Sequence, residues 1–130
     1  MGFLNNLLRR GDMDFLNGQP LSSKFNIIVN ILNDSVFDGN GDIIVISERA
    51  FNLYPQKTDS QHIIRFFYQM NVLTIQWGFK YYQKEVVHNK DFTPVKNLSI
   101  FEQQKIAQKT IDEMEYVIEN HKSKVLSTLY

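Results

Sequence analysis

The segment from Leu73 to Tyr81 constrains the fold more than any other part of this sequence. Its apolar residues occupy every second position, and polar or small residues lie between them. Because side chains alternate between the two faces of a β-strand, the pattern is typical of a strand with one buried face. We expect that face to carry Leu73, Ile75, Trp77, Phe79 and Tyr81. The strand is predicted to run from Val72 to about Val87.

Three further stretches have strand character. Residues 43–46 form a continuous β-branched run, which favours a strand buried on both faces or at the centre of a sheet. Residues 49–54 alternate and end at a proline, as a short strand does. Residues 62–70 are rich in residue types that favour strands, but Asp59 and Ser60 are suitable helix caps, so a helix remains the alternative. With strand as the favoured interpretation, Met70 and Asn71 form a tight turn into the strand that follows.

Two segments have helical periodicity. Phe25, Ile28, Val29 and Leu32 repeat at three- and four-residue intervals, which predicts a helix capped by Ser22 or Ser23 and ending before Asp34; a strand is the rival assignment. Near the C-terminus, Ser99 and Glu102 form a capping box, in which each side chain accepts a hydrogen bond from the backbone of the other. A long helix is expected from there to about residue 125.

These elements predict an α+β fold. We expect an antiparallel meander of three to four strands, packed against a helix from the N-terminal half and the long C-terminal helix. A chain of 130 residues favours a single domain over residues 1–130, with residues 1–20 appended as a short helix and a loop. The apolar residues of that first helix recur at helical spacing, and Arg9 and Arg10 leave a weak membrane-surface contact as an alternative to docking on the domain.

Composition narrows the function classes. The formal net charge is zero, with 14 basic and 14 acidic residues, which argues against binding to nucleic acid or to an anionic membrane as the main function. The absence of cysteine excludes disulfides, thiolate metal sites and cysteine nucleophiles, and it fits a cytoplasmic location. No apolar run has the roughly 18 to 20 residues that a membrane span needs.

No catalytic, cofactor-binding or metal-binding set is recognised. Asp38, Asn40 and Asp42 have the opening spacing of a calcium loop, but Ile43 stands where that loop needs glycine and Arg49 where it needs a bidentate glutamate. A plain turn is therefore expected. The three histidines lie on separate elements without the spacing of a metal-binding helix. The acids between residues 34 and 48, with no base among them, predict an acidic edge.

Three functional hypotheses follow. The leading one is a non-enzymatic interaction or adaptor module with an unidentified protein partner. A second is a small-ligand binder or enzyme with a pocket between sheet and helix, using His62 or His88 together with tyrosines. A third is weak single-stranded nucleic-acid binding through an exposed contact set of Lys80, Tyr82 and Lys84.

The C-terminal helix also suggests a homodimer. Ala107 and the three residues of a candidate dimer seam, Ile111, Met114 and Ile118, form a narrow apolar stripe at three-four spacing. The same stripe suits packing on the protein's own sheet, and both alternatives stay open at this point.

Overall fold

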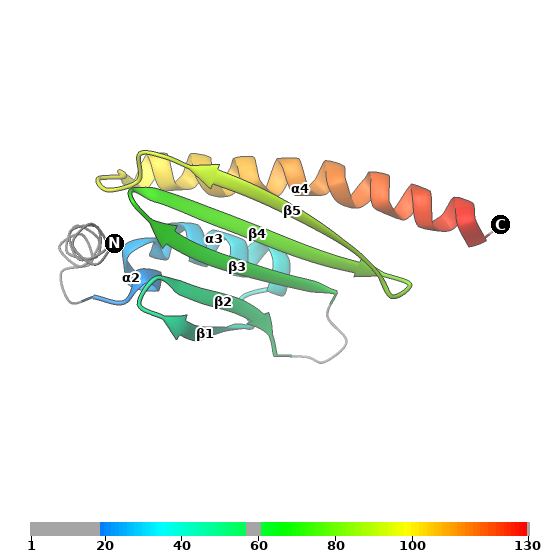
Figure 1. Ribbon diagram of the computed structural model, residues 1–130, viewed down its shortest axis with the longest axis horizontal. Helices are drawn as coiled ribbons and strands as arrows, with labels where there is room; N and C mark the ends of the chain where they lie inside the picture. Colours follow the sequence, from blue (N-terminus) through cyan, green and yellow to red (C-terminus); the bar gives the residue numbers. More distant parts are fainter. Residues whose placement is uncertain (1–18, 57–60, 130) are drawn as a thin grey trace, which may run out of the picture.

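The computed structural model describes residues 19–56 and 61–129. The predicted helix near the N-terminus and most of the loop after it lie outside these residues. The described elements, in chain order, are α2 (Leu21–Lys24), α3 (Asn26–Phe37), β1 (Gly41–Ser47), β2 (Ala50–Pro55), β3 (His62–Gln69), β4 (Val72–Tyr81), β5 (Lys84–Phe92) and α4 (Ile100–Leu129). The α+β class is confirmed, and residues 62–69 are a strand (Figure 1).

The strands form one antiparallel sheet in the order β1-β2-β3-β4-β5. It has five strands, so the prediction of three to four was wrong. The predicted strand from Val72 to Val87 is in fact two strands, because Tyr82 and Gln83 take positive φ angles of 49° and 62° and reverse the chain between them. This turn lacks the glycine or asparagine that marks most such hairpins, which is why the sequence conceals it.

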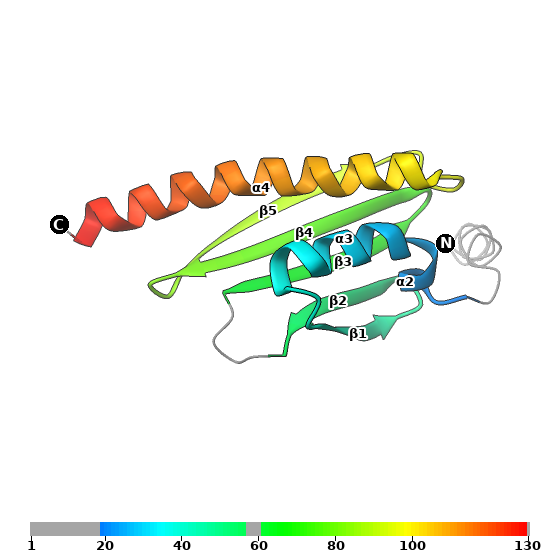
Figure 2. The same cartoon turned by 180° about the vertical axis from the view of Figure 1, so that it is seen from behind.

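Both long helices cover the same face of the sheet. Figure 2 shows α3 and α4 side by side in front of the strands, while in Figure 1 none of the described helices lies over the opposite face. α3 contacts β2, whereas α4 contacts β4, β5 and α3. The sheet therefore has a helix face, which contains the core, and an open face.

The alternation in β4 defines the core as the sequence predicts. Leu73, Ile75, Trp77 and Phe79 are buried on the helix face, and Trp77 is only 4% exposed. Strands β2 and β3 contribute further buried side chains to the same cluster, namely Phe51, Leu53, Ile64, Phe66 and Tyr68. The helices α3 and α4 cover it with Ile28, Val29, Leu32, Ala107 and Met114.

The turn between β3 and β4 is also confirmed. Met70 and Asn71 have φ angles of 53° and 64°, the left-handed region that asparagine tolerates. The Oδ1 atom of Asn71 accepts hydrogen bonds from the backbone N–H groups of Val95 and Lys96, both at 2.9 Å. One side chain thereby fastens this turn to the segment that leads into α4.

The helix limits need two corrections. α3 continues to Phe37 instead of ending before Asp34, because Val36 and Phe37 extend its apolar side and Phe37 is buried. The predicted serine caps are absent: Pro20 precedes α2, Phe25 precedes α3, and neither helix has a side-chain cap hydrogen bond.

The start of α4 agrees with the prediction. Ser99 and Glu102 exchange backbone-to-side-chain hydrogen bonds of 3.1 Å, and the helix extends to Leu129, one turn beyond the expected end. Hydrogen bonds from the backbone and hydroxyl of Ser99 hold the pKa of Glu102 below its usual value. Within residues 19–56 and 61–129, no helix combines the length and apolar character that crossing a bilayer requires.

Candidate functional site

Among the described residues, the most unusual surface is the edge of the sheet at β1, where no described strand pairs on the outer side. Four consecutive aliphatic residues of this strand are exposed: Ile43 by 45%, Ile44 by 44%, Val45 by 65% and Ile46 by 59%. The sequence predicts the opposite, a strand buried on both faces, and that prediction was wrong. The physical reason is topological: β1 is the first strand of the meander, and α3 contacts β2, further inside the sheet.

Alternation places the exposed aliphatic residues on both faces of β1. Ile43 and Val45 pair with Leu53 and Phe51 of β2 and share the helix face with them, while Ile44 pairs with Asn52 on the open face. A register irregularity between Val45 and Ser47 interrupts the pairing near the end of the strand. The regular free edge therefore extends from Gly41 to Val45.

The opposite edge of the sheet, β5, has a different character. Its charged residues are Lys84, Glu85, Lys90 and Asp91, and α4 contacts it from the helix face. Charged side chains and a covering helix are the usual means by which proteins prevent an edge strand from pairing with another chain. β1 carries one charged residue, Asp42, and no lysine or proline. Of the two edges, β1 is therefore the one suited to accept a further strand.

The start of β1 is held firmly by α3. The N–H of Gly41 donates a hydrogen bond of 2.8 Å to Oδ1 of Asn33. A Cβ atom at Gly41 would lie 2.7 Å from that oxygen and 3.0 Å from side-chain carbons of Leu53 and Phe37. The glycine is required by this close approach, and the exposed strand begins from a fixed point.

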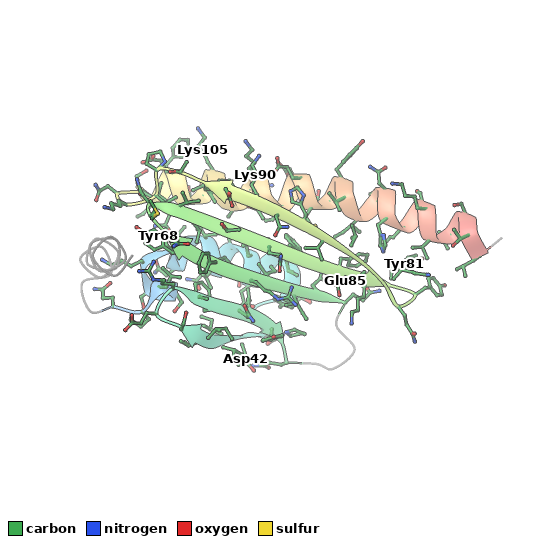
Figure 3. All side chains as sticks on the ribbon, viewed as in Figure 1. Asp42, Tyr68, Tyr81, Glu85, Lys90 and Lys105 are labelled. Atoms are coloured by element: carbon green, nitrogen blue, oxygen red, sulfur yellow. The ribbon has the colours of Figure 1, made fainter. Side chains whose placement is uncertain are left out.

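A shallow hollow lies on the open face beside β1. Its volume is about 470 Å³, and it extends across the sheet from Asp42 and Tyr54 to Gly78 and Glu85. Arg65 and Lys80 also line it, and Nη1 of Arg65 donates a 3.1 Å hydrogen bond to Oε1 of Gln76 on β4. The sequence predicted a pocket between sheet and helix, whereas this hollow lies on the face opposite the helices. Figure 3 shows Asp42 on β1 and Glu85 on β5.

His62 has a structural contact that limits its use as a base. The indole N–H of Trp77 donates a 3.1 Å hydrogen bond to Nδ1 of His62, and the ring of His62 also packs against Phe79. Burial, followed by the positive charge of Lys122, lowers the pKa of His62 from its usual 6.5. The neutral form with hydrogen on Nε2 fits this arrangement, because the indole can only donate.

His88 lies in a polar bridge between the sheet and α4. Its Nε2 atom is 3.6 Å from Oε2 of Glu113, and Nζ of Lys90 is 3.3 Å from Oε1 of the same carboxylate. Burial raises the pKa of Glu113, but the hydrogen bond from Lys90 and the charges of Lys90 and His88 outweigh it, so that the pKa is lowered. Lys90 thereby joins β5 to α4, while Nε2 of His88 forms an ion pair with the same carboxylate at a distance too long for a hydrogen bond.

The predicted contact set is divided by the β4–β5 turn. Lys80 is exposed on the open face, where it pairs with Glu85, whereas Lys84 pairs with Tyr81 on the helix face. Tyr82 lies in the turn between them, exposed and in edge contact with Tyr81 at a ring separation of 4.7 Å. The side chains of Lys80 and Lys84 therefore lie on opposite faces of the sheet. The sequence placed them on one face because it treated residues 72–87 as a single strand, and the turn between β4 and β5 removes that relation.

The predicted dimer seam lies against the protein's own core. Met114 is fully buried, Ile111 is 9% exposed, and Ile118 is partly buried against the same cluster. This placement corresponds to the intramolecular alternative. Self-association stays a prediction that must involve another surface.

The turn that leads from α3 into β1 covers residues 38–40, whereas Gly41 and Asp42, which the sequence placed in the turn, already belong to β1. In the part of the chain that the structure describes, no three His, Cys, Asp or Glu side chains are grouped so as to hold a metal ion. Comparison with protein-family models, curated proteins and solved structures found no match.

Proposed function

We propose that this protein is a non-enzymatic interaction module that binds an extended segment of another polypeptide along the free edge of β1. The observation that carries the proposal is the exposure of four consecutive aliphatic residues, Ile43 to Ile46, on a strand that pairs with β2 alone within the described chain. An added strand would use the unpaired backbone groups for hydrogen bonds and cover the aliphatic side chains of both faces.

Two properties of β1 support this mode of binding. Its start is fixed through Gly41 and Asn33, so a partner would meet a strand that is already in the extended conformation. Its free side chains are aliphatic and β-branched, which pack well against the side chains of a neighbouring strand. The binding of an extended segment thus orders the partner more than the protein.

The ligand-binding alternative has weaker support. The hollow on the open face is shallow and presents acids and bases together, namely Asp42, Arg65, Lys80 and Glu85. Small-molecule sites enclose most of their ligand between apolar walls, which an open sheet face does not provide. The two histidines of that hypothesis are also engaged in contacts that hold the fold together.

Selection from a library of random linear peptides on the immobilised full chain tests the proposal. Enriched peptides should have alternating aliphatic residues and should slow hydrogen exchange of the amides in β1. The variant Val45→Lys should lose their binding, because it introduces a charge at the most exposed aliphatic residue of the edge. The matched control is Val87→Lys, which alters an exposed valine of the other edge strand, β5.

The proposal is wrong if the enriched peptides bind Val45→Lys as tightly as the wild type, or if they protect another part of the sheet. Both variants replace exposed side chains, and their circular dichroism spectra and melting temperatures should match those of the wild type within the range typical of surface substitutions.

A further inference from the structure

The neighbourhood of β1 is negatively charged. Residues 25–48, which include α3 and β1, contain Asp34, Asp38, Asp42 and Glu48 but no lysine, arginine or histidine. The adjacent strand β2 contains no charged residue. The bases of this neighbourhood are Arg49, in the turn after β1, and Arg65 and Lys80, which line the same hollow as Asp42; the strand next to β1 supplies none.

The acids are concentrated at the Gly41 end of the edge. Asp34 and Asp38 lie at the C-terminus of α3, and both are exposed, as is Asp42. A helix C-terminus carries a partial negative charge of its own, so carboxylates there add to the field of the helix instead of offsetting it. Asn33 brings this end of α3 into contact with Gly41. A strand that pairs with β1 would pass beside Asp42, with the carboxylate of Asp38 three residues before Gly41 in the chain.

We infer that the segment bound by β1 has alternating aliphatic residues and carries lysine or arginine at the end that lies beside Asp42. This inference rests on the proposed function, since it names the partner chemistry for the same edge. The aliphatic core of such a segment would cover Ile43, Ile44 and Val45, and its basic end would lie in the field of Asp38 and Asp42.

A second copy of this chain fits the edge less well. If two β1 strands pair antiparallel about a two-fold axis at Ile43, the middle of the regular edge, Asp42 of each copy lies opposite Ile44 of the other. The two Asp42 side chains are then diagonal neighbours on one face of the sheet, and two carboxylates so placed repel each other. A basic partner segment avoids this repulsion.

Designed peptides with one common core test the charge requirement. The core alternates valine and threonine over the length of β1, and it is flanked by lysine at the N-terminal end, at the C-terminal end or at both, or by serine or glutamate at both ends. Affinities are measured with the full chain by fluorescence anisotropy of labelled peptides. The lysine position that binds more tightly also gives the direction of the added strand, because only one end of the peptide lies beside Asp42.

The doubly lysine-flanked peptide should bind about fivefold more tightly than the serine peptide at low salt, and the glutamate peptide should bind most weakly. High salt should reduce these differences. The double variant Asp38→Asn, Asp42→Asn should remove the preference while leaving the serine peptide unaffected. Glu85→Gln, which removes an exposed acid from the distant edge strand β5, is the matched control and should keep the preference.

The outcomes separate this inference from the proposed function. Equal affinities for all flanks, together with loss of binding in Val45→Lys, would overturn the charge inference and leave edge binding intact. If none of these peptides binds and selection also yields no peptide sensitive to Val45→Lys, the proposed function itself fails. A doubled mass in light scattering that Val45→Lys returns to 15.3 kDa would identify a second copy as the occupant and contradict the inference.

Discussion

Replacing Trp77 by alanine should destabilise the fold strongly. The indole is 4% exposed and lies on the helix face between Ile75 and Phe79. Removing a buried tryptophan side chain costs about 3 to 5 kcal/mol from lost burial and the cavity that remains. The substitution also leaves Nδ1 of His62 without its indole donor, which adds about 1 kcal/mol or more to the cost.

The expected shift in melting temperature follows from chain length. At about 2.1 cal/mol/K per residue, unfolding a chain of this size has an entropy of about 0.27 kcal/mol/K, so each kcal/mol lowers the melting temperature by about 4 °C. Trp77→Ala should therefore melt at least 12 °C below the wild type. Trp77→Phe keeps most of the ring and should cost about 1 to 3 kcal/mol, mainly through the lost hydrogen bond.

Thermal and urea unfolding followed by far-UV circular dichroism measure both variants. Trp77 is the only tryptophan of the chain, so its fluorescence gives an independent readout in the wild type, where emission should be that of a buried indole. A Trp77→Ala variant that melts within about 2 °C of the wild type would refute the placement of this side chain in the core. A double-mutant cycle of Trp77→Phe with His62→Phe isolates the hydrogen bond.

Three further predictions concern stability. Asn71→Ala should cost about 2 to 4 kcal/mol in urea unfolding, since it removes two backbone contacts and places alanine at a φ of 64°; Asn71→Gly should recover only the part due to φ. Gly41→Ala should cost about 1 to 3 kcal/mol because its Cβ meets Asn33, Leu53 and Phe37, and a wild-type midpoint would contradict the close approach. Burial and the charge of Lys122 lower the pKa of His62 in the folded protein, so on acidification below about pH 6.5 the unfolded chain takes up a proton that the folded chain does not. The free energy of unfolding should therefore fall as the pH decreases below about 6.5. His62→Gln should lose less of its free energy of unfolding over this pH range.

The sequence specified those elements whose side chains meet the core. The alternation of Leu73 to Phe79 and the stripe of Ala107, Ile111 and Met114 are both buried as their periods require. The Ser99 capping box is likewise local, because its two hydrogen bonds join residues three positions apart. Local signals of this kind are readable without knowledge of the partners in space.

The predictions that were wrong concern features whose structure depends on which elements lie next to them in space. A β-branched run such as residues 43–46 has the same composition at the centre of a sheet and at its edge, so only the strand order could place it. The turn at Tyr82 and Gln83 has no glycine or asparagine, and its positive φ angles are imposed by the pairing of the strands on either side. The candidate site was therefore visible in sequence as a pattern but assigned to the wrong position.

β1 contributes no side chain to the buried core cluster of the described residues. Its contacts with the rest of the fold include the close approach at Gly41 and hydrogen bonds that Asp42 accepts from Gln56 and Ser47 accepts from the backbone of Arg49, whereas the aliphatic side chains of Ile43 to Ile46 remain exposed. Substitutions along Ile43 to Ile46 therefore carry little penalty in folding. Under the proposed edge binding, the residues that select a partner are separate from those that form the core, so that partner choice can diverge while the fold is maintained.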